Sequence, residues 1–433
     1  MSSIASTGKS SAFLHNLIAL FGVQAVNYIV PLLTIPYLTR VLKPEGWGKV
    51  AFVQSLGFML ITVMEYGFSL SAARDVSVRR DDKRFLKLQF GSVTGAKLLL
   101  LTVAVSISLM ALRWIPFLSS NPRMFAAGLV WAAAQGMSPL WLYQGLERLR
   151  IPSAIDVLWK VLGLAALFVL VKAPSATQTV LVIYATASVC STLTLYTMAL
   201  LKYGATVPGT IDIARVLREG WAVFILQMAV STYTTANAFV LGLVAPQYEV
   251  GIYSGAERVS RSLLGLLGPL NQALYPRMSK DVHADKSSAA GTVRRAFYLV
   301  LAITTTIALL AALVAAPMIG LFLGHNFRAS IAVLRIMVLL LPIVGASNML
   351  GLQWMLPLRL DRQFSTIIVC GGVMNIMLAS VLAKHLFARG MAISAVCAEL
   401  TVTLSCLLYL SKKRLNPLAK SHISLPDLGQ DAG

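Results

Sequence analysis

Apolar stretches of about 20 residues, separated by short polar connections, recur along the whole chain. At 1.5 Å per helical residue, each stretch is long enough to cross the roughly 30 Å hydrocarbon layer of a membrane. The pattern therefore predicts an all-α integral membrane protein with about 12 transmembrane helices. These helices are expected at residues 13–38, 48–73, 86–111, 124–143, 154–171, 179–201, 220–243, 251–275, 296–322, 331–355, 366–383 and 391–410.

Two segments of the sequence, residues 16–78 and 219–281, resemble one another. Each reads as an apolar span, a short turn, a second apolar span and a basic loop. Because each half holds an even number of spans, we expect two six-helix bundles of the same orientation. They would be related by a pseudo-two-fold axis along the membrane normal and would surround a central cavity, as is typical of transporters. Residues that match at the common spacing include Gln24 with Gln227, Gly48 with Gly251, and Arg74 with Arg277.

Lysine and arginine lie mainly in alternate connections. The N-terminal tail, the loops after even-numbered spans and the C-terminal tail hold more than twice as many as the loops after odd-numbered spans. The positive-inside rule therefore predicts that both termini are cytoplasmic.

Helical spacing of apolar and basic residues in the linker between the halves indicates a short interfacial helix. The polar tail after Ser411 is expected to be disordered. The predicted organisation is a cytoplasmic N-terminal tail at 1–12, an N-terminal six-helix bundle at 13–201, a cytoplasmic linker at 202–219, a C-terminal six-helix bundle at 220–410 and a cytoplasmic C-terminal tail at 411–433.

The bulk composition excludes a soluble protein, since 57% of the residues are hydrophobic and only 12% are charged. The formal net charge of +20 does not indicate nucleic-acid binding, because the positive residues follow the membrane pattern. The 4 cysteines lie in apolar stretches and the 5 histidines lack ligand spacing, so we expect no metal and no cofactor. The connections are too short to house a separate catalytic domain, which argues against an enzyme such as a membrane glycan polymerase or ligase.

Five segments of the chain closely resemble Wzx-type oligosaccharide flippases. They cover the first two spans of each half, whereas the remaining spans match that family only in length and hydropathy. Lys43 departs from the pattern, because glycine would be expected in the turn before Pro44. The five segments are Asn27–Gly48 (NYIVPLLTIPYLTRVLKPEGWG), Glu65–Asp75 (EYGFSLSAARD), Tyr233–Val244 (YTTANAFVLGLV), Val250–Val259 (VGIYSGAERV) and Asn271–Ser279 (NQALYPRMS).

The resemblance implies the fold of the multidrug/oligosaccharidyl-lipid/polysaccharide exporter (MOP) superfamily. It also implies a cargo, a polyprenyl-pyrophosphate-linked oligosaccharide. This cargo would move from the inner to the outer leaflet of a bacterial inner membrane for the assembly of surface polysaccharide such as O-antigen. Membrane lipids and other polysaccharide-assembly membrane proteins are the expected partners. The alternative is a drug or small-molecule/ion antiporter of the same superfamily, although arginines in the cavity would repel cationic drugs.

Charged side chains inside the predicted spans are the candidates for a cargo site. Placing one in hydrocarbon costs about 2.5–3.5 kcal/mol, so each is expected to face a watery cavity or a partner. Arg258 and Arg261 project from neighbouring positions on one helix face, and their guanidinium groups fit phosphate oxygens bidentately. The alternative for both is a structural ion pair with a glutamate. Lys97, near the middle of the third span, is a further candidate for substrate binding and is expected to face a cavity.

Two further groups of residues inside the spans have two interpretations each. Three glutamates fit either coupling to a proton or ion, or an ion pair with one of the cations above. Four amide side chains could bind sugar hydroxyls in a cavity, or could hold helices together, which is their commoner role in membranes. The glutamates are Glu65, Glu257 and Glu399, and the amides are Gln24, Asn27, Gln227 and Asn237.

Overall fold

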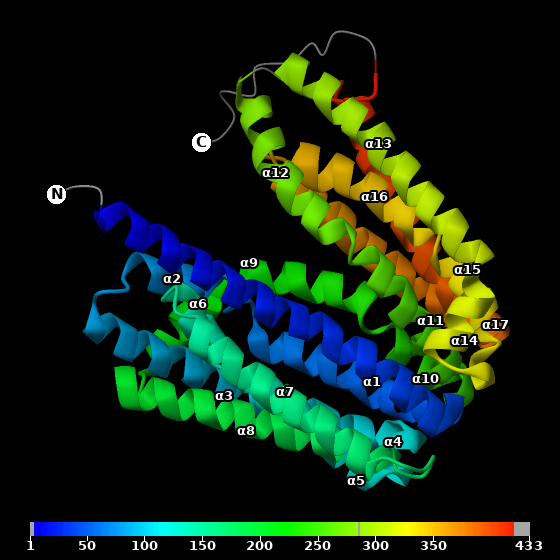
Figure 1. The fold of residues 1–433 in the computed structure, drawn as a ribbon, viewed down its shortest axis with the longest axis horizontal. Helices are drawn as coiled ribbons and strands as arrows, with labels where there is room; N and C mark the ends of the chain where they lie inside the picture. The colour runs from blue at the N-terminus through cyan, green and yellow to red at the C-terminus, as the bar shows by residue number, and fades with distance from the viewer. Residues whose placement is uncertain (1–3, 285, 420–433) are drawn as a thin grey trace. The chain divides into compact units, whose positions relative to one another are not determined.

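The computed structural model is built from helices, and the residues that it describes contain no strand (Figure 1). It describes residues 4–284 and 286–419, with their side chains except those of residues 4–29, 232, 233, 283, 284 and 286–288. The helices are α1 (Ile4–Glu65), α2 (Ser71–Val78), α3 (Lys83–Trp114), α4 (Pro116–Ser120), α5 (Pro122–Met137), α6 (Leu140–Gly145), α7 (Arg150–Leu170), α8 (Thr177–Tyr203), α9 (Thr210–Thr234), α10 (Asn237–Val244), α11 (Gln247–Leu264), α12 (Leu267–Ala284), α13 (Lys286–Leu313), α14 (Ala315–Phe322), the 3₁₀ helix η1 (His325–Phe327), α15 (Ser330–Met337), α16 (Leu340–Leu350), the π-helix η2 (Gly351–Met355) and α17 (Asp361–Lys412).

Residue contacts divide the chain into two compact units, Met1–Ser231 (unit 1) and Thr232–Gly433 (unit 2). In unit 1, α5 lies against α1 and α8, and α7 lies against α8. In unit 2, α16 lies against α13 and α17, and α11 lies against α15. Each unit buries its own clusters of apolar side chains, so each has a separate core.

Two of the long helices are broken inside. In α1 the break is at Lys43, which has φ 59° and ψ 175°. In α17 it is at Phe387, which has φ 47° and ψ −126°. Both values of φ lie in the region that favours glycine. The first break falls between the first two predicted spans, at the residue where the resemblance leads one to expect glycine, and the second falls between the last two predicted spans.

Local sequence signals account for several helix ends. Asp82 precedes α3, and its Oδ1 accepts hydrogen bonds from the backbone amides of Arg84 and Phe85, both at 3.0 Å. Pro116 and Pro122 occupy the first positions of α4 and α5, where a missing amide hydrogen costs nothing. Gly204, with φ 70°, ends α8.

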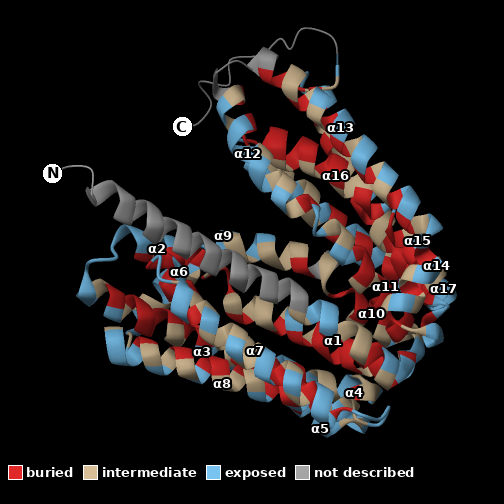
Figure 2. Cartoon of the chain, in the orientation of Figure 1, coloured by how far each residue is buried: buried red, intermediate tan, exposed pale blue. Residues whose placement is uncertain are grey.

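Many apolar side chains face outward, as expected for helices in contact with lipid. Seven helical ranges within the described residues are long and apolar enough to cross a membrane. On one of them, α7, Leu158, Leu162 and Val169 are 54%, 48% and 63% exposed, and Figure 2 shows the exposed positions along this helix. Such exposure would be unfavourable in water, so the structure is that of a multi-pass membrane protein. The total of 12 spans stays a prediction.

Small residues let α1 and α5 approach closely. A Cβ atom added at Gly128 of α5 would overlap the side chain of Val53, and one added at Gly136 would overlap that of Met64. Close contact between helix backbones is the usual basis of helix association in membranes, where lipid offers no hydrophobic driving force. The α1–α5 contact positions the end of α1, at Glu65, beside the end of α5.

The linker helix predicted between the halves is longer than expected. α9 runs from Thr210 to Thr234 and therefore continues into the span predicted at 220–243. The ring of Phe224 stacks on that of Tyr66 at 4.4 Å, and the hydroxyl groups of Ser231 and Thr62 are 3.2 Å apart. These contacts explain why the residues up to Ser231 belong to unit 1.

The prediction of a disordered tail after Ser411 is wrong for its first residues. Leu415 is 4% exposed, and its carbonyl oxygen accepts a hydrogen bond of 2.8 Å from Nε1 of Trp354. Leu415 and Leu418 belong to the apolar cluster of unit 2 that contains Trp354. Burial of these two leucines outweighs the polar composition on which the prediction rested. Residues 420–433 of the predicted tail lie outside the described residues.

Lys43→Gly is expected to stabilise the protein. The side chain of Lys43 is exposed, and a non-glycine residue at this φ and ψ carries strain of about 1–3 kcal/mol. Thermal unfolding in detergent should shift upward for this variant. Arg40→Gly is the matched control, because Arg40 is also exposed but has regular helical geometry, where glycine costs about 1 kcal/mol. A downward shift for both variants would contradict the assignment of strain to Lys43.

Candidate functional site

Unit 2 contains a pocket of about 380 Å³ between its helices. Polar residues of α10 and α11 form part of its wall, and Glu399 of α17 contributes a further carboxyl group. Apolar side chains from α11, α15, α16 and α17 complete it. The lining residues are Thr234, Asn237, Tyr253, Glu257, Ser260, Arg261, Leu264, Gly265, Met337, Leu340, Val344, Ala395 and Glu399.

An ion pair lies on the α11 wall of this pocket. Arg261 Nη2 is 2.9 Å from Oε1 of Glu257, one helical turn earlier. The hydroxyl of Tyr253, a further turn back, is 3.5 Å from the same carboxylate oxygen. The Arg261 side chain is 43% exposed, whereas that of Glu257 is 13% exposed and Tyr253 is fully buried. One side of α11 therefore carries a cation near the surface and hydrogen-bonding groups below it.

Two more polar pairs surround the pocket. Asn375 Nδ2 on α17 donates to Oδ1 of Asn237 on α10 at 2.8 Å, and Asn237 also hydrogen-bonds Tyr253. Ser347 Oγ on α16 donates to Oε1 of Glu399 at 2.7 Å. Asn237, Asn375 and Glu399 are 4%, 1% and 8% exposed. These bonds tie α10, α11, α16 and α17 together and fix the polar groups of the pocket in place.

The pocket brings together four of the predicted site residues, Asn237, Glu257, Arg261 and Glu399. Arg258 is half-buried on the same helix but is not among the described residues that line the pocket. Three predicted site residues lie in unit 1 instead: Gln227 is half-buried on α9, and Lys97 and Glu65 form a second cluster. The side chains of Gln24 and Asn27 lie outside the described residues.

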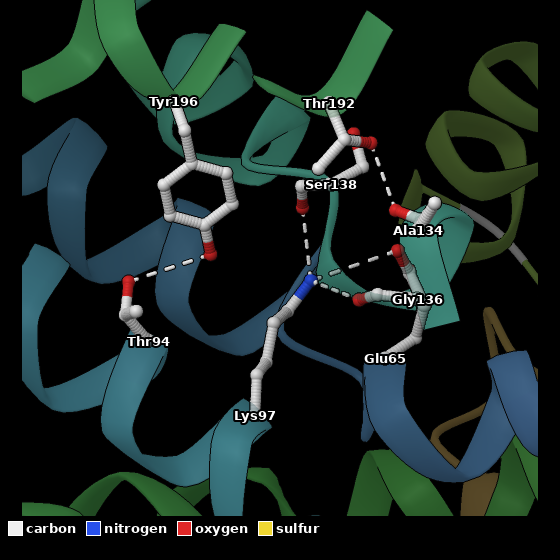
Figure 3. Close-up of polar contacts among 8 residues, drawn as sticks. All are labelled: Glu65, Thr94, Lys97, Ala134, Gly136, Ser138, Thr192 and Tyr196. Atoms are coloured by element: carbon white, nitrogen blue, oxygen red, sulfur yellow. Dashed lines mark hydrogen bonds and ion pairs between the residues drawn. The ribbon is translucent and has the colours of Figure 1, made fainter. Parts of the chain in front are cut away.

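Lys97 lies in the interior of unit 1 and is 1% exposed (Figure 3). Its ammonium group donates hydrogen bonds to the backbone carbonyl oxygens of Gly136, at 2.8 Å, and Ser138, at 2.9 Å. Oε1 of Glu65, at the end of α1, is 3.9 Å away. The sequence predicts that Lys97 faces a cavity and binds substrate, whereas these contacts direct its charge to the backbone between α5 and α6.

The break between α5 and α6 frees carbonyl groups that Lys97 and Thr192 satisfy. The carbonyl oxygen of Ala134 accepts from Oγ1 of Thr192 on α8 at 2.8 Å. The carbonyl oxygen of Gln135 accepts a hydrogen bond of 3.1 Å from the backbone amide of Ser138. The carbonyl oxygens of Gly136 and Ser138 accept hydrogen bonds from the ammonium group of Lys97. Side chains from two other helices therefore compensate for bonds that a continuous helix would make itself.

Sequence reasoning missed several members of both sites. Asn375 could have been found, because it is an amide inside a predicted span and meets the criterion that selected Asn237. Ser138 and Pro139 in the fourth predicted span signal a helix break. Nothing in the spacing pointed to Thr192 or Ser347, because serine and threonine are common in membrane helices.

Comparison with known proteins agrees with the fold and with the resemblance found in the sequence. Residues 13–282 match the family described as polysaccharide biosynthesis protein. Two relatives, both provisionally named O-antigen transporters, align with nearly the whole chain. The one from Escherichia coli (strain K12) is 26% identical over 408 residues, which cover 93% of this chain and 97% of the relative. The one from Shigella dysenteriae is 28% identical over 401 residues, which cover 90% of this chain and 98% of the relative.

Solved structures of transporters have a similar fold. The lipid II flippase MurJ in an inward closed conformation matches with a TM-score of 0.67 and 14% identity, over 91% of this chain and 87% of MurJ. An inward-facing multidrug resistance MATE family transporter of the MOP superfamily matches with a TM-score of 0.60 and 15% identity. The match covers 89% of this chain and 97% of that transporter. The predicted MOP-superfamily fold is confirmed.

Lys97→Met is expected to destabilise unit 1 by about 2–5 kcal/mol, because it leaves two buried carbonyl groups without the ammonium donor and Glu65 without its cation. Glu65→Gln should cost about 1 kcal/mol or less, because its side chain is 33% exposed and its contact is long. Thermal unfolding of both purified variants in detergent measures the difference. Equal stability of Lys97→Met and the wild-type protein would show that the α5–α6 break does not depend on this side chain.

Proposed function

Because the chain belongs to the polysaccharide biosynthesis protein family, we propose that it is a flippase for lipid-linked oligosaccharides. Its cargo is a polyprenyl-pyrophosphate-linked oligosaccharide repeat unit, which it moves from the inner to the outer leaflet of the bacterial inner membrane. The names of the two relatives and of the MurJ structure support transport of this class of lipid. They name transporters and a flippase, which favours transport over catalysis.

The observation that carries the cargo proposal is the position of Arg261 at the pocket of unit 2. Its side chain is 43% exposed on α11, and Arg258 lies one turn earlier on the same helix. A pyrophosphate needs several cationic donors at short range, and a guanidinium binds phosphate through parallel hydrogen bonds. We therefore assign the pyrophosphate group of the cargo to Arg258 and Arg261.

Transport proceeds by alternating access in this proposal. The polyprenyl chain stays in the bilayer, because transferring so much apolar surface to water would be very unfavourable. The polar head enters the protein from the cytoplasmic side, and a rearrangement of the two halves opens it to the outer side. Both termini lie in the cytoplasm, as the distribution of basic residues predicts. Other membrane proteins of polysaccharide assembly would receive the product.

Energy coupling is assigned to carboxyl groups that lie inside the membrane region. Glu399 and Glu257 line the pocket of unit 2, and Glu65 lies beside Lys97 in unit 1. A carboxyl group at membrane depth is a candidate site for a proton or cation. The same arrangement would suit an ion-coupled antiporter for small molecules, and transport assays with lipid-linked cargo distinguish the two functions.

The double variant Arg258→Ala/Arg261→Ala is expected to flip the cargo roughly 100-fold more slowly, or slower still. The reason is that each hydrogen bond to a charged group contributes about 1.5–3 kcal/mol. The assay follows the change of leaflet of a fluorescent polyprenyl-pyrophosphate oligosaccharide in liposomes under a proton or sodium gradient. Arg335→Ala is the matched control, since Arg335 is an arginine of a predicted span in unit 2 that does not line the pocket. Rapid flipping by a folded double variant would exclude the arginines as the pyrophosphate site.

A further inference from the structure

Exposed cations gather at one end of unit 1, where three connections meet. Arg80 Nη1, in the connection after α2, is 2.9 Å from Oε2 of Glu147, in the connection after α6. Gly204, in the connection after α8, lies against the side chain of Lys87 near the start of α3. We call this end of the unit the basic surface. Its exposed basic residues are Arg74, Arg79, Arg80, Lys83, Arg84, Lys87, Arg148, Arg150 and Lys202.

Most of these cations have no anionic partner within the described residues. Acidic residues in the same three segments are fewer than half as many, and most of them are already engaged. Asp75 pairs with Arg74 at 3.7 Å, and Glu147 pairs with Arg80. The carboxylate of Asp82 accepts two backbone amides at the start of α3. So much positive charge without a counter-charge on one surface favours an anionic partner outside the protein.

The linker after α8 is held closely against α3 at two glycines. A Cβ atom added at Gly91 would overlap the backbone carbonyl of Thr206, and one added at Gly95 would lie 3.0 Å from the ring of Pro208. The backbone amide of Thr206 is also 3.4 Å from the carbonyl oxygen of Lys87. These contacts fix the path of the linker along unit 1 and determine which of its side chains face outward.

Large apolar side chains face outward at the basic surface. Val207 of the linker is 97% exposed, and Ile211 at the start of α9 is 83% exposed. Val78 and Leu201, at 77% and 84%, each directly precede a basic residue of the surface. Single exposed apolar residues are common, but these lie among cations, beside the ends of two helices long enough to cross a membrane. Such a combination is typical of segments that lie between lipid head groups and acyl chains.

We propose that the basic surface binds the head groups of anionic phospholipid in the membrane leaflet that it faces. The lipid phosphates lie at the exposed arginines and lysines, and Val207 and Ile211 lie among the upper parts of the acyl chains. All three connections are predicted to be cytoplasmic, and anionic lipids attract basic segments at the membrane surface. An acidic soluble protein would satisfy the charge but not the apolar side chains. Lipid binding here is independent of the cargo that the protein transports.

Titration with two fluorescent lipids tests this surface. Phosphatidylglycerol has a negatively charged head group, whereas phosphatidylcholine with the same acyl chains is neutral overall. The purified full-length protein, in a neutral detergent, should bind phosphatidylglycerol about tenfold more tightly than phosphatidylcholine. The preference should decrease when the salt concentration is raised from about 0.05 M to about 0.5 M, because exposed charges are screened.

The triple variant Lys83→Gln/Arg84→Gln/Arg148→Gln removes three cations of the basic surface. All three side chains are exposed and form no ion pair with a described residue, so the variant is expected to fold. It should lose most of the preference for phosphatidylglycerol, with its affinity for phosphatidylcholine unchanged. The variant Lys83→Arg/Arg84→Lys/Arg148→Lys conserves the charges and should keep the preference.

Arg113→Gln/Arg123→Gln/Lys172→Gln is the matched control. It removes the same charge at exposed positions of unit 1, at the end of α3, the start of α5 and directly after the C-cap residue of α7. This variant should keep most of the preference. An equal loss of preference in the control would overturn the proposal, because the net charge of the protein would then determine lipid binding. Equal affinity of the wild-type protein for both lipids would also overturn it, and would point to an acidic soluble partner.

The double variant Val207→Ser/Ile211→Ser tests the apolar contacts. It should weaken the binding of both lipids by the same factor, about threefold, because contacts with acyl chains do not depend on the head group. Unchanged affinity for both lipids would overturn the placement of these two side chains among the acyl chains.

Discussion

Inside hydrocarbon, a helix that breaks must find protein partners for the backbone groups that it releases, because no water is present to bind them. Unit 1 meets this requirement between α5 and α6, where Lys97 and Thr192 supply the donors for three carbonyl groups. Full burial of Lys97 follows from this, since the charge is solvated by carbonyl dipoles instead of water. The same ammonium attracts Glu65, and the end of α1 is thereby linked to the break. A single buried cation thus connects three helices.

The constraint also shapes the pocket of unit 2. Each buried polar group on its wall has a hydrogen-bond partner on another helix or on a neighbouring turn, as for Asn237 with Asn375 and Glu399 with Ser347. These bonds stabilise the packing of the helices and hold the groups in one orientation. Preorganised groups lose little freedom when a ligand arrives. The arrangement that keeps polar groups tolerable in a membrane is therefore also suited to binding a polar head group.

Helical elements were predictable from the sequence because apolar length and spacing report them directly. The repeat of the two halves stays a prediction. The break at Lys43 also followed, since the family pattern leads one to expect glycine there. Pairing within one helix could be predicted, since the sequence offered an ion pair with a glutamate for Arg261 and the structure pairs it with Glu257 one turn away. Pairing between helices could not, because it depends on tertiary packing. Arg258 and Arg261 were correctly placed on one helix, but positions i and i+3 differ by about 60° around the axis. That difference is sufficient for Arg261 to line the pocket while Arg258 does not.

A carrier must bind its cargo well enough to select it and weakly enough to release it on the other side. In the proposed mechanism, the Arg261–Glu257 ion pair serves both requirements. The guanidinium of Arg261 is already paired with Glu257, so the proposed pyrophosphate contact adds only the difference in binding free energy between the two anionic partners. An unpaired arginine at this position would hold a phosphate more tightly and would slow its departure. In this mechanism, a cation that is already paired therefore favours release of the cargo and turnover.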